Sequence, residues 1–343
     1  MIDDDGRVQA LCLHYLFLPH NRKVQTQYIE YKLGDSNYIS WYNISIFYVT
    51  IFSDAIILNN TRRIILLSYI DAIILGLVQG LTEFLPVSSS GHLLITQHFL
   101  GISGDSVLIF TILLHVGTLV SIFFCYWDDL AALIKELFIT IADLVRGRGL
   151  KLDERPIRKL GVMIIIASIP TAIIGLAFND LFESFYQTLL PTGVGLLITG
   201  CLLWIAQTKR NNTTGIKEMK WSHAVVIGTM QGIAICPGIS RSGSTLVGGL
   251  LSGLEREFAV EFAFLISIPS ILGSLILEAH GGDMGAAVGS SMGPIIVGGI
   301  VAAVSGVLAI KTMITVVRKF SLRYFSVYVW IVGAFLIIYT LMN

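Results

Sequence analysis

The sequence has little charge. Only 13% of its 343 residues are charged, whereas 54% are hydrophobic, and the 23 basic and 23 acidic side chains cancel. A chain without a basic excess offers no electrostatic footprint for nucleic acid. A soluble helical protein would need charged faces on most helices, and these are missing. Several apolar runs of about twenty residues instead suit helices that cross a hydrocarbon core. We therefore predict an all-α integral membrane protein with the bilayer as its partner.

Cysteine is also scarce. The four cysteines are scattered along the chain at Cys12, Cys125, Cys201 and Cys236. They form neither a metal-ligand spacing nor a disulfide framework. We interpret them as small buried hydrophobic residues.

Two polar interruptions of the apolar sequence share one pattern. Six residues of the first recur in the second at an offset of 152: Gly76, Gln79, Gly80, Ser88, Ser90 and Gly91 match Gly228, Gln231, Gly232, Ser240, Ser242 and Gly243. Each copy is apolar, then broken by proline, then rich in serine and glycine, then apolar again. This order predicts a helix, an interruption and a second helix.

The chain around these interruptions predicts two repeats, residues 68–207 and 221–343. The broken pairs are 68–85 with 92–100 and 222–236 with 244–254, and the expected spanning helices are 106–126, 160–178, 189–206, 258–278, 294–312 and 324–341. The members of each broken pair are too short to span well, so we expect re-entrant hairpins, which require surrounding protein or a wet cavity. Residues 1–67 differ in composition, and we expect a poorly ordered leader or a mis-assigned upstream extension.

Basic residues indicate the orientation. With both hairpins re-entrant, one side receives 16 of the 23 Lys and Arg residues, in loops 127–159, 208–220, 255–257 and 311–323. The loops on the other side contain none. The positive-inside rule makes the basic side cytoplasmic. Three spans per repeat is an odd number, so the second repeat is inverted, and the two serine-rich tips are expected to meet near the midplane.

The first hairpin contains an acid at membrane depth, Glu83, with Gln79 one helical turn earlier. An intramembrane carboxylate is costly and is a functional candidate, although a position near the interface would also satisfy it. Ser88, Ser89 and Ser90 precede the second helix, where hydroxyls and free amides form an anion site, but capping alone explains one serine.

Two histidines follow the first hairpin's acid. His92, at the start of the second helix, is a candidate acid or base. His115 lies within a predicted span near no other polar cluster, and we interpret it as structural.

The second hairpin contains Arg241 at membrane depth, where it needs an anionic partner. A guanidinium matches phosphate geometry with paired hydrogen bonds. The surrounding small and hydroxyl residues favour phosphate binding, and they are Gly238, Ser240, Ser242, Ser244 and Thr245. An ion pair between Arg241 and Glu83 that holds the hairpins together is a compatible alternative. The glycines of segment 298–306 are expected to serve close helix packing.

These motifs resemble those of the undecaprenyl-diphosphatase family, the bacitracin-resistance type of polyprenyl-diphosphate phosphatase. The resemblance covers about residues 68–343. The family's (Glu/Gln)-x-x-x-Glu motif is matched by Gln79 and Glu83, and its Pro-Gly-x-Ser-Arg-Ser-x-x-Thr motif by residues 237–245. Its Pro-x-Ser-Ser-x-Gly-His segment is matched by Pro86, Ser88, Ser89, Gly91 and His92. Many members have glutamate where this chain has Gln79, which affects any mechanism that needs two carboxylates for the metal.

The resemblance implies hydrolysis of a polyprenyl diphosphate to the monophosphate, which recycles a lipid carrier for cell-envelope glycan synthesis. It also implies a plasma-membrane location, an outward-facing active site and a divalent cation, Mg²⁺ or Ca²⁺. In the implied roles Arg241 clamps phosphate, and Glu83 works with the metal or as a base. Ser89 is a candidate nucleophile, and His92 assists proton transfer. A homodimer is a further expectation, and attack by serine or by activated water stays open.

Two alternatives were weighed. Phosphatidic-acid-type phosphatases also use Ser-Gly-His and Ser-Arg segments, but they need His and Asp at positions that are Val247 and Leu251 here. A transporter or flippase of a phosphorylated polyprenyl lipid would also fit inverted repeats. Phosphate release by the purified protein distinguishes an enzyme from a transporter.

A chain shortened to begin at Ser68 is expected to insert and to release phosphate like the full chain, because every predicted site residue and span lies after that residue. The measurement is diphosphatase turnover in detergent at matched expression. Loss of activity at normal expression would show that residues 1–67 contribute.

Overall fold

The computed structural model describes two separate units, Met1–Asn60 and Thr61–Asn343. Its described residues are 7–14, 25–32, 68–102, 105–209, 212–281 and 292–342. In the first unit, strand β1 (Arg7–His14) pairs antiparallel with β2 (Gln25–Lys32), with Arg7 opposite Lys32. The rest of the predicted leader, residues 1–67, lies outside the described residues, and so does most of the predicted loop 279–293. The leader therefore stays a prediction.

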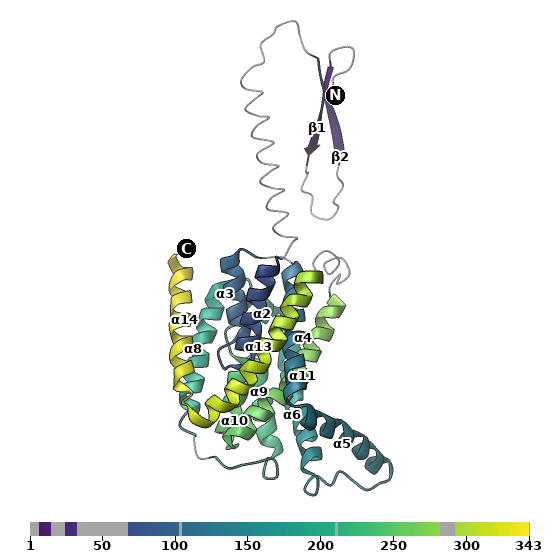
Figure 1. Ribbon diagram of the computed structural model, residues 1–343, viewed down its shortest axis with the longest axis vertical. Helices are drawn as coiled ribbons and strands as arrows, with labels where there is room; N and C mark the ends of the chain where they lie inside the picture. Colours follow the sequence, from purple (N-terminus) through teal and green to yellow (C-terminus); the bar gives the residue numbers. More distant parts are fainter. Residues whose placement is uncertain are drawn as a thin grey trace. The chain divides into compact units, whose positions relative to one another are not determined.

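The named elements in the described part of the second unit are all helices (Figure 1). Its helices are α2 (Tyr69–Phe84), α3 (Ser89–Leu100), α4 (Asp105–Cys125), α5 (Trp127–Val145), α6 (Pro156–Ala177), α7 (Asn179–Phe185), α8 (Leu189–Ala206), α9 (Trp221–Ile233), α10 (Arg241–Leu251), α11 (Arg256–Gly281), α13 (Met292–Lys319) and α14 (Arg323–Met342). The predicted all-α class is confirmed for this unit.

Five helices are long and apolar enough to cross a membrane: α6, α8, α11, α13 and α14. Helix α4 joins them as a sixth candidate when it is taken together with α5, from which an 86° bend separates it. At most of their ends, these helices agree with the six predicted spans to within a few residues. The chain is therefore a multi-pass membrane protein.

The two broken pairs form helical hairpins at the predicted places. Helix α2 has 16 residues and α9 has 13, so at 1.5 Å per residue they reach at most about 24 Å, less than the hydrocarbon core. Figure 1 shows α2 and α3 in the upper half of the helical unit and α9 and α10 in the lower half. This placement is what inverted repeats require, and the repeat relationship itself stays a prediction.

Small residues bring each hairpin against a spanning helix. Helix α2 packs on α13, and α9 packs on α6. A Cβ added at Gly80 would overlap Ser305 and the Ala302 carbonyl on α13, and one added at Gly228 would overlap the Ala167 carbonyl on α6. Contacts this close are open only to glycine, as in other membrane helix pairs. The predicted packing role of segment 298–306 is confirmed, because its glycines lie against α2 and α4.

Helix α5 corrects the prediction that residues 127–159 are a loop. Residues 127–145 form a helix, and the side chains of Arg158 and Asp143 are buried. Arg158 donates to Asp143 over 2.8 Å and to Glu136 over 2.9 Å, which ties α5 to the start of α6. Asp128 and Asp129, in the first turn of α5, are exposed.

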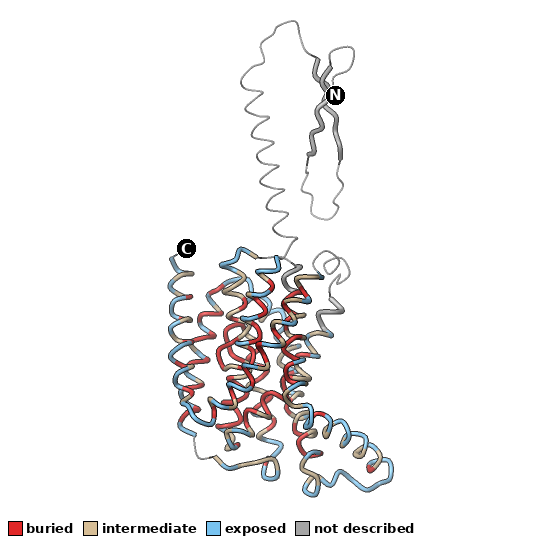
Figure 2. The backbone as a smooth tube through the Cα atoms, viewed as in Figure 1, coloured by how far each residue is buried: buried red, intermediate tan, exposed pale blue. Residues whose placement is uncertain are grey.

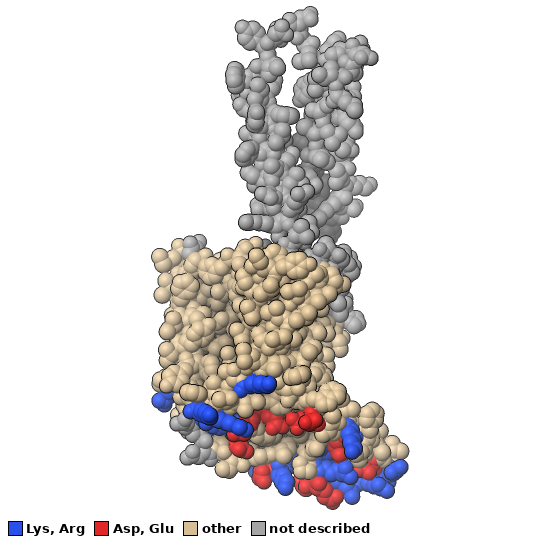
Figure 3. Space-filling model, in the orientation of Figure 1, with Lys and Arg blue, Asp and Glu red and all other residues tan. Residues whose placement is uncertain are grey.

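Buried residues and charged residues have different distributions in the helical unit. Buried residues gather inside the bundle, while the outward faces of α14 and α5 are largely exposed (Figure 2). The charged side chains on the face in Figure 3 gather at its lower end, near α5 and the loops between helices. Among the described residues, none is seen on the upper part of that face, which agrees with the segregation of Lys and Arg in the sequence.

Replacing Gly228 with alanine is expected to lower the apparent melting temperature in detergent by several degrees. The new Cβ would overlap the Ala167 carbonyl, and overpacking of this kind costs about 1–3 kcal/mol. Gly273→Ala in α11 is the matched control, because an added Cβ there meets nothing within 4 Å. Equal losses for the two variants would contradict the close α9–α6 contact.

Candidate functional site

The two hairpin tips use the same capping bonds. Ser88 caps α3 by accepting from the amide of Gly91 at 3.3 Å, and Ser240 caps α10 by accepting from the amide of Gly243 at 3.0 Å. In each tip the capping hydroxyl also lies 3.3 Å from the hydroxyl two residues later. These residues correspond at the offset of 152 seen in the sequence. Two serines per tip are thus engaged in ordering a helix start.

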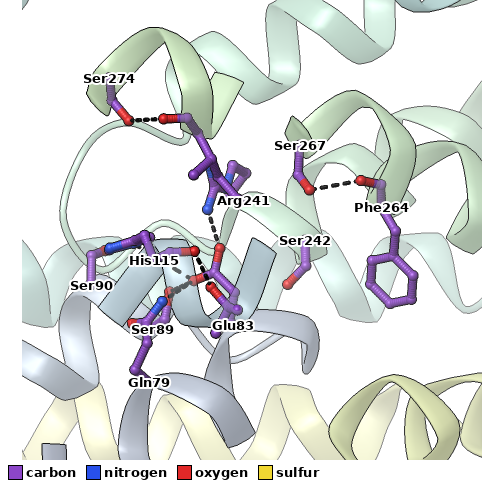
Figure 4. Close-up of polar contacts among 12 residues, drawn as sticks. Gln79, Glu83, Ser89, Ser90, His115, Arg241, Ser242, Phe264, Ser267 and Ser274 are labelled. Atoms are coloured by element: carbon purple, nitrogen blue, oxygen red, sulfur yellow. Dashed lines mark hydrogen bonds and ion pairs between the residues drawn. The ribbon is translucent and has the colours of Figure 1, made fainter. Parts of the chain in front are cut away.

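Ser89 and Arg241 occupy equivalent places. Each is the first residue of the second helix of its hairpin, and they too are 152 residues apart. Both side chains reach the carboxylate of Glu83, which comes from α2 (Figure 4). Two helix N-termini therefore converge on one acidic group, and this convergence creates a site that favours anions.

The Glu83 carboxylate is held on both oxygens. Arg241 pairs with Oε1, while Ser89 donates to Oε2 at 2.5 Å and Gln79 donates to Oε2 at 2.9 Å. The Glu83 side chain is only 3% exposed, whereas that of Arg241 is 22% exposed. A buried carboxylate needs such partners to remain charged. The guanidinium, by contrast, retains an accessible surface for a ligand.

The hairpin tips touch directly. Ser242 at the second tip donates to the Leu85 carbonyl at the first over 3.0 Å. A Cβ added at Gly91 would lie 3.3 Å from the Cα of Gly238, whose backbone turns with a φ of 84°. Because Ser89 and Arg241 share one carboxylate, their side chains lie within about 8 Å of each other, and the tips meet as the sequence predicts. A transporter with two alternating sites would instead suit tips that are well separated, and the two tips here are in contact.

Ser88 adopts an unusual backbone conformation. Its φ is 72° and its ψ is 95°, outside the helix and strand regions. A non-glycine residue with positive φ costs on the order of 1–3 kcal/mol, and such residues cluster at functional sites. Here the turn at Ser88 places Ser89 over Glu83, six residues earlier in the chain.

Other predicted residues lie at the tips without contacting this carboxylate in the described contacts. His92 bonds to the Ser88 carbonyl and, at 2.8 Å, to the hydroxyl of Tyr328 on α14. Thr245 donates to helix carbonyls, and the buried hydroxyl of Ser244 has no protein partner. Their phosphate-binding and proton-transfer roles stay predictions.

Two residues were missed by the sequence analysis. His115 was expected near no polar cluster, and this is wrong, because its Nε2 lies 3.8 Å from Glu83 Oε2. Tyr328 stacks on His92 with ring centroids 5.6 Å apart. Both residues lie in regular apolar spans, and no local pattern distinguished them. Their roles arise from helix packing alone.

The oxygen atoms of Glu83 and Gln79 fit the divalent cation that the family resemblance implies. Gln79 uses its amide nitrogen on Glu83, and its buried Oε1 has no protein partner. Carboxylate and amide oxygens are ligands that Mg²⁺ and Ca²⁺ prefer. No group of three His, Cys, Asp or Glu residues that could hold a metal occurs in the described part of the chain. The protein therefore offers an incomplete ligand set, which suits a cation completed by phosphate oxygens.

Comparison with known proteins agrees with this geometry. The family model described as bacitracin resistance protein BacA matches residues 72–335. The chain is 51% identical over 272 residues to an undecaprenyl-diphosphatase of Alkaliphilus metalliredigens, covering 79% of this chain and 98% of that protein. It is 40% identical to one of Carboxydothermus hydrogenoformans, covering 78% and 95%, and 38% identical to one of Methanosphaera stadtmanae, covering 80% and 98%. The match spans both hairpins and every span between them, so the chain belongs to the bacitracin resistance protein BacA family.

Proposed function

We propose that the protein is an undecaprenyl-diphosphate phosphatase. It hydrolyses the polyprenyl diphosphate to the monophosphate and phosphate, and so recycles the lipid carrier for cell-envelope glycan synthesis. Family membership and the names of the relatives support this activity. The observation that carries it is the Glu83 carboxylate, shared by Ser89 and Arg241 where two helix N-termini meet.

Phosphate binding falls to Arg241 and the helix starts. A guanidinium presents paired donors that match phosphate oxygens, and the amides of the first turns of α3 and α10 add partial positive charge. A bound diphosphate would compete with Glu83 for Arg241. The half-buried hydroxyl of Ser90, at the second position of α3, is a further donor, whereas that of Ser242 in α10 would have to leave the Leu85 carbonyl to donate to phosphate. Charge that develops on the transferring phosphoryl group is thereby stabilised, which is the main requirement of this reaction.

The hydrogen bond from Ser89 to Glu83 supports a covalent route. Ser89 Oγ attacks the terminal phosphorus while its proton passes to Glu83 Oε2, and the bridging P–O bond breaks to release polyprenyl monophosphate. Glu83 passes this proton to the departing monophosphate and is again a carboxylate. Water then attacks the phosphorus of the phosphoserine while Glu83 takes a proton from that water, the bond between Ser89 Oγ and phosphorus breaks, and Glu83 returns the proton to Ser89 Oγ as inorganic phosphate leaves. The same carboxylate serves both steps, so no second base is required.

Glu83 and Gln79 are the residues that would hold the divalent cation. When bound, a cation of this kind neutralises charge on phosphate oxygens and orients the diphosphate. Gln79 Oε1 is free to act as a metal ligand, because the Gln79 amide nitrogen donates to Glu83 and Oε1 has no protein partner. With the cation bound, Arg241 still binds phosphate, Ser89 still attacks phosphorus, and Glu83 still transfers protons.

The plasma membrane is the proposed location, and the active site opens to the outside. The support is the gathering of Lys and Arg at one end of the helical unit, which the positive-inside rule makes cytoplasmic. The diphosphate then descends from the outer leaflet with its prenyl tail between helices. A homodimer stays a prediction.

Arg241→Ala is expected to lower diphosphatase turnover by at least about a hundredfold, because a preorganised charge at the phosphoryl group is lost. Arg241→Lys is expected to recover only part of the rate, since an ammonium lacks the planar pair of donors. Phosphate release by purified protein measures both. Arg148→Ala is the matched control, because that arginine is 58% exposed in an ion pair with Asp143 at the end of α5. Wild-type turnover in a folded Arg241→Ala protein would remove the clamp from the mechanism.

Ser89→Ala and Glu83→Gln are each expected to lower turnover by at least about a hundredfold, and the double variant is expected to be little worse than either one. Residues that act as one unit are not additive. Kinetics of the three variants test this, with Ser168→Ala as a control whose hydroxyl bonds only to the Ile164 carbonyl in the described contacts.

Multiplicative losses would separate the two residues and favour direct attack by water. Phosphoserine trapped at Ser89 by rapid acid quench would support the covalent route independently.

A further inference from the structure

His115 is held in a fixed orientation beside the active-site carboxylate. It lies on α4, 32 positions after Glu83 in the chain, and its Nε2 is 3.8 Å from Glu83 Oε2. Its other ring nitrogen, Nδ1, is 2.8 Å from the carbonyl oxygen of Thr111. Figure 4 shows the ring directed at the cluster formed by Glu83, Ser89 and Gln79.

The contact with Thr111 determines which nitrogen carries the hydrogen. A carbonyl oxygen can only accept, so Nδ1 donates, and in the neutral imidazole Nε2 presents its lone pair toward Glu83. Two acceptors then face each other at 3.8 Å. Histidines that bind metals have this arrangement: one nitrogen donates to a backbone carbonyl, and this fixes the other as the ligand.

A third acceptor lies in the same cluster. Gln79 Oε1 is buried and has no protein partner, and the Gln79 amide is bonded to the same Glu83 oxygen that faces His115. The cluster therefore offers three possible metal ligands: Nε2 of His115, a carboxylate oxygen of Glu83 and Oε1 of Gln79. The N–H groups of His115 and Gln79 already donate to Thr111 and Glu83. Side-chain exposure of 25% at His115 gives a ligand access to this side of the carboxylate.

We infer that His115 is a nitrogen ligand of the divalent cation, completing a set with Glu83 and Gln79. The inference rests on the proposed function for its cation, and it adds a residue outside the two sequence motifs. The aromatic nitrogen also determines metal preference. Imidazole favours transition metals over Ca²⁺ and Mg²⁺, so the set favours Mn²⁺ or Co²⁺ more than an all-oxygen site would. Phosphate oxygens of the substrate fill the remaining positions.

The experiment uses the full chain in detergent with Mn²⁺ alone. Pulsed electron paramagnetic resonance of the bound Mn²⁺ is expected to show coupling to an imidazole ¹⁴N. In protein labelled with ¹⁵N-histidine, coupling to ¹⁵N is expected to replace it. The coupling is expected to vanish in His115→Gln and to persist in His92→Gln. His92 is the control because its nitrogens bond to Ser88 and Tyr328. Mn²⁺ affinity is expected to fall at least about tenfold in His115→Gln, with a smaller change for Ca²⁺.

Each result decides the inference. Absence of ¹⁴N coupling in the wild-type protein overturns it without any variant, so a poorly folded His115→Gln protein leaves the test intact. Persistence of the coupling in His115→Gln also overturns it. Phosphate release is measured separately: histidine coupling in a protein without diphosphatase activity would refute the proposed function and leave the ligand in place.

Discussion

The ion pair between Glu83 and Arg241 is the constraint on which the rest of the structure depends. Each charge would be expensive alone within a membrane, and the two residues come from hairpins 158 positions apart in sequence. Their pairing therefore requires the two tips to meet. Ser89 and Gln79 complete the hydrogen bonds of the carboxylate, and so the partners that stabilise the charge are also the groups that the proposed chemistry uses.

Close helix packing makes this meeting geometrically feasible. Gly76 and Gly80 let α2 lie on α13, while Gly228 and Gly232 let α9 lie on α6. Two short helices that cannot span the bilayer are thus held at fixed depth by long helices that can. The serine caps at Ser88 and Ser240 then satisfy amides at the tips without water. Polar irregular backbone is tolerated at this depth because protein surrounds it.

One carboxylate with several partners suits phosphoryl transfer better than a complete metal cage would. The substrate carries most of the charge and many of the oxygen ligands, so the protein needs a cationic clamp, an oriented nucleophile and a partial ligand set. In the proposed mechanism, Arg241, Ser89 and Glu83 provide these, and the three side chains lie within one cluster. Ser89 and Arg241 occupy equivalent helix starts, so the predicted repeat would bear a hydroxyl in one copy and a guanidinium in the other, matching the two different roles proposed for them.

The sequence by itself determined the membrane class and both hairpins, and it predicted that the hairpin tips carrying Glu83, Ser89 and Arg241 meet. These follow from local signals: apolar length, proline breaks, hydroxyl caps and charges too costly to leave unpaired in a bilayer. It did not identify α5 as a helix, because its charged residues were interpreted as a cytoplasmic loop. It also did not place His115 or Tyr328 at the site, since each occupies one position in an otherwise ordinary span. Only the tertiary structure decided that α4 turns His115 toward Glu83 and that α14 brings Tyr328 to His92. Such contacts depend on how separate helices pack and rotate against each other, and local sequence patterns do not encode that geometry.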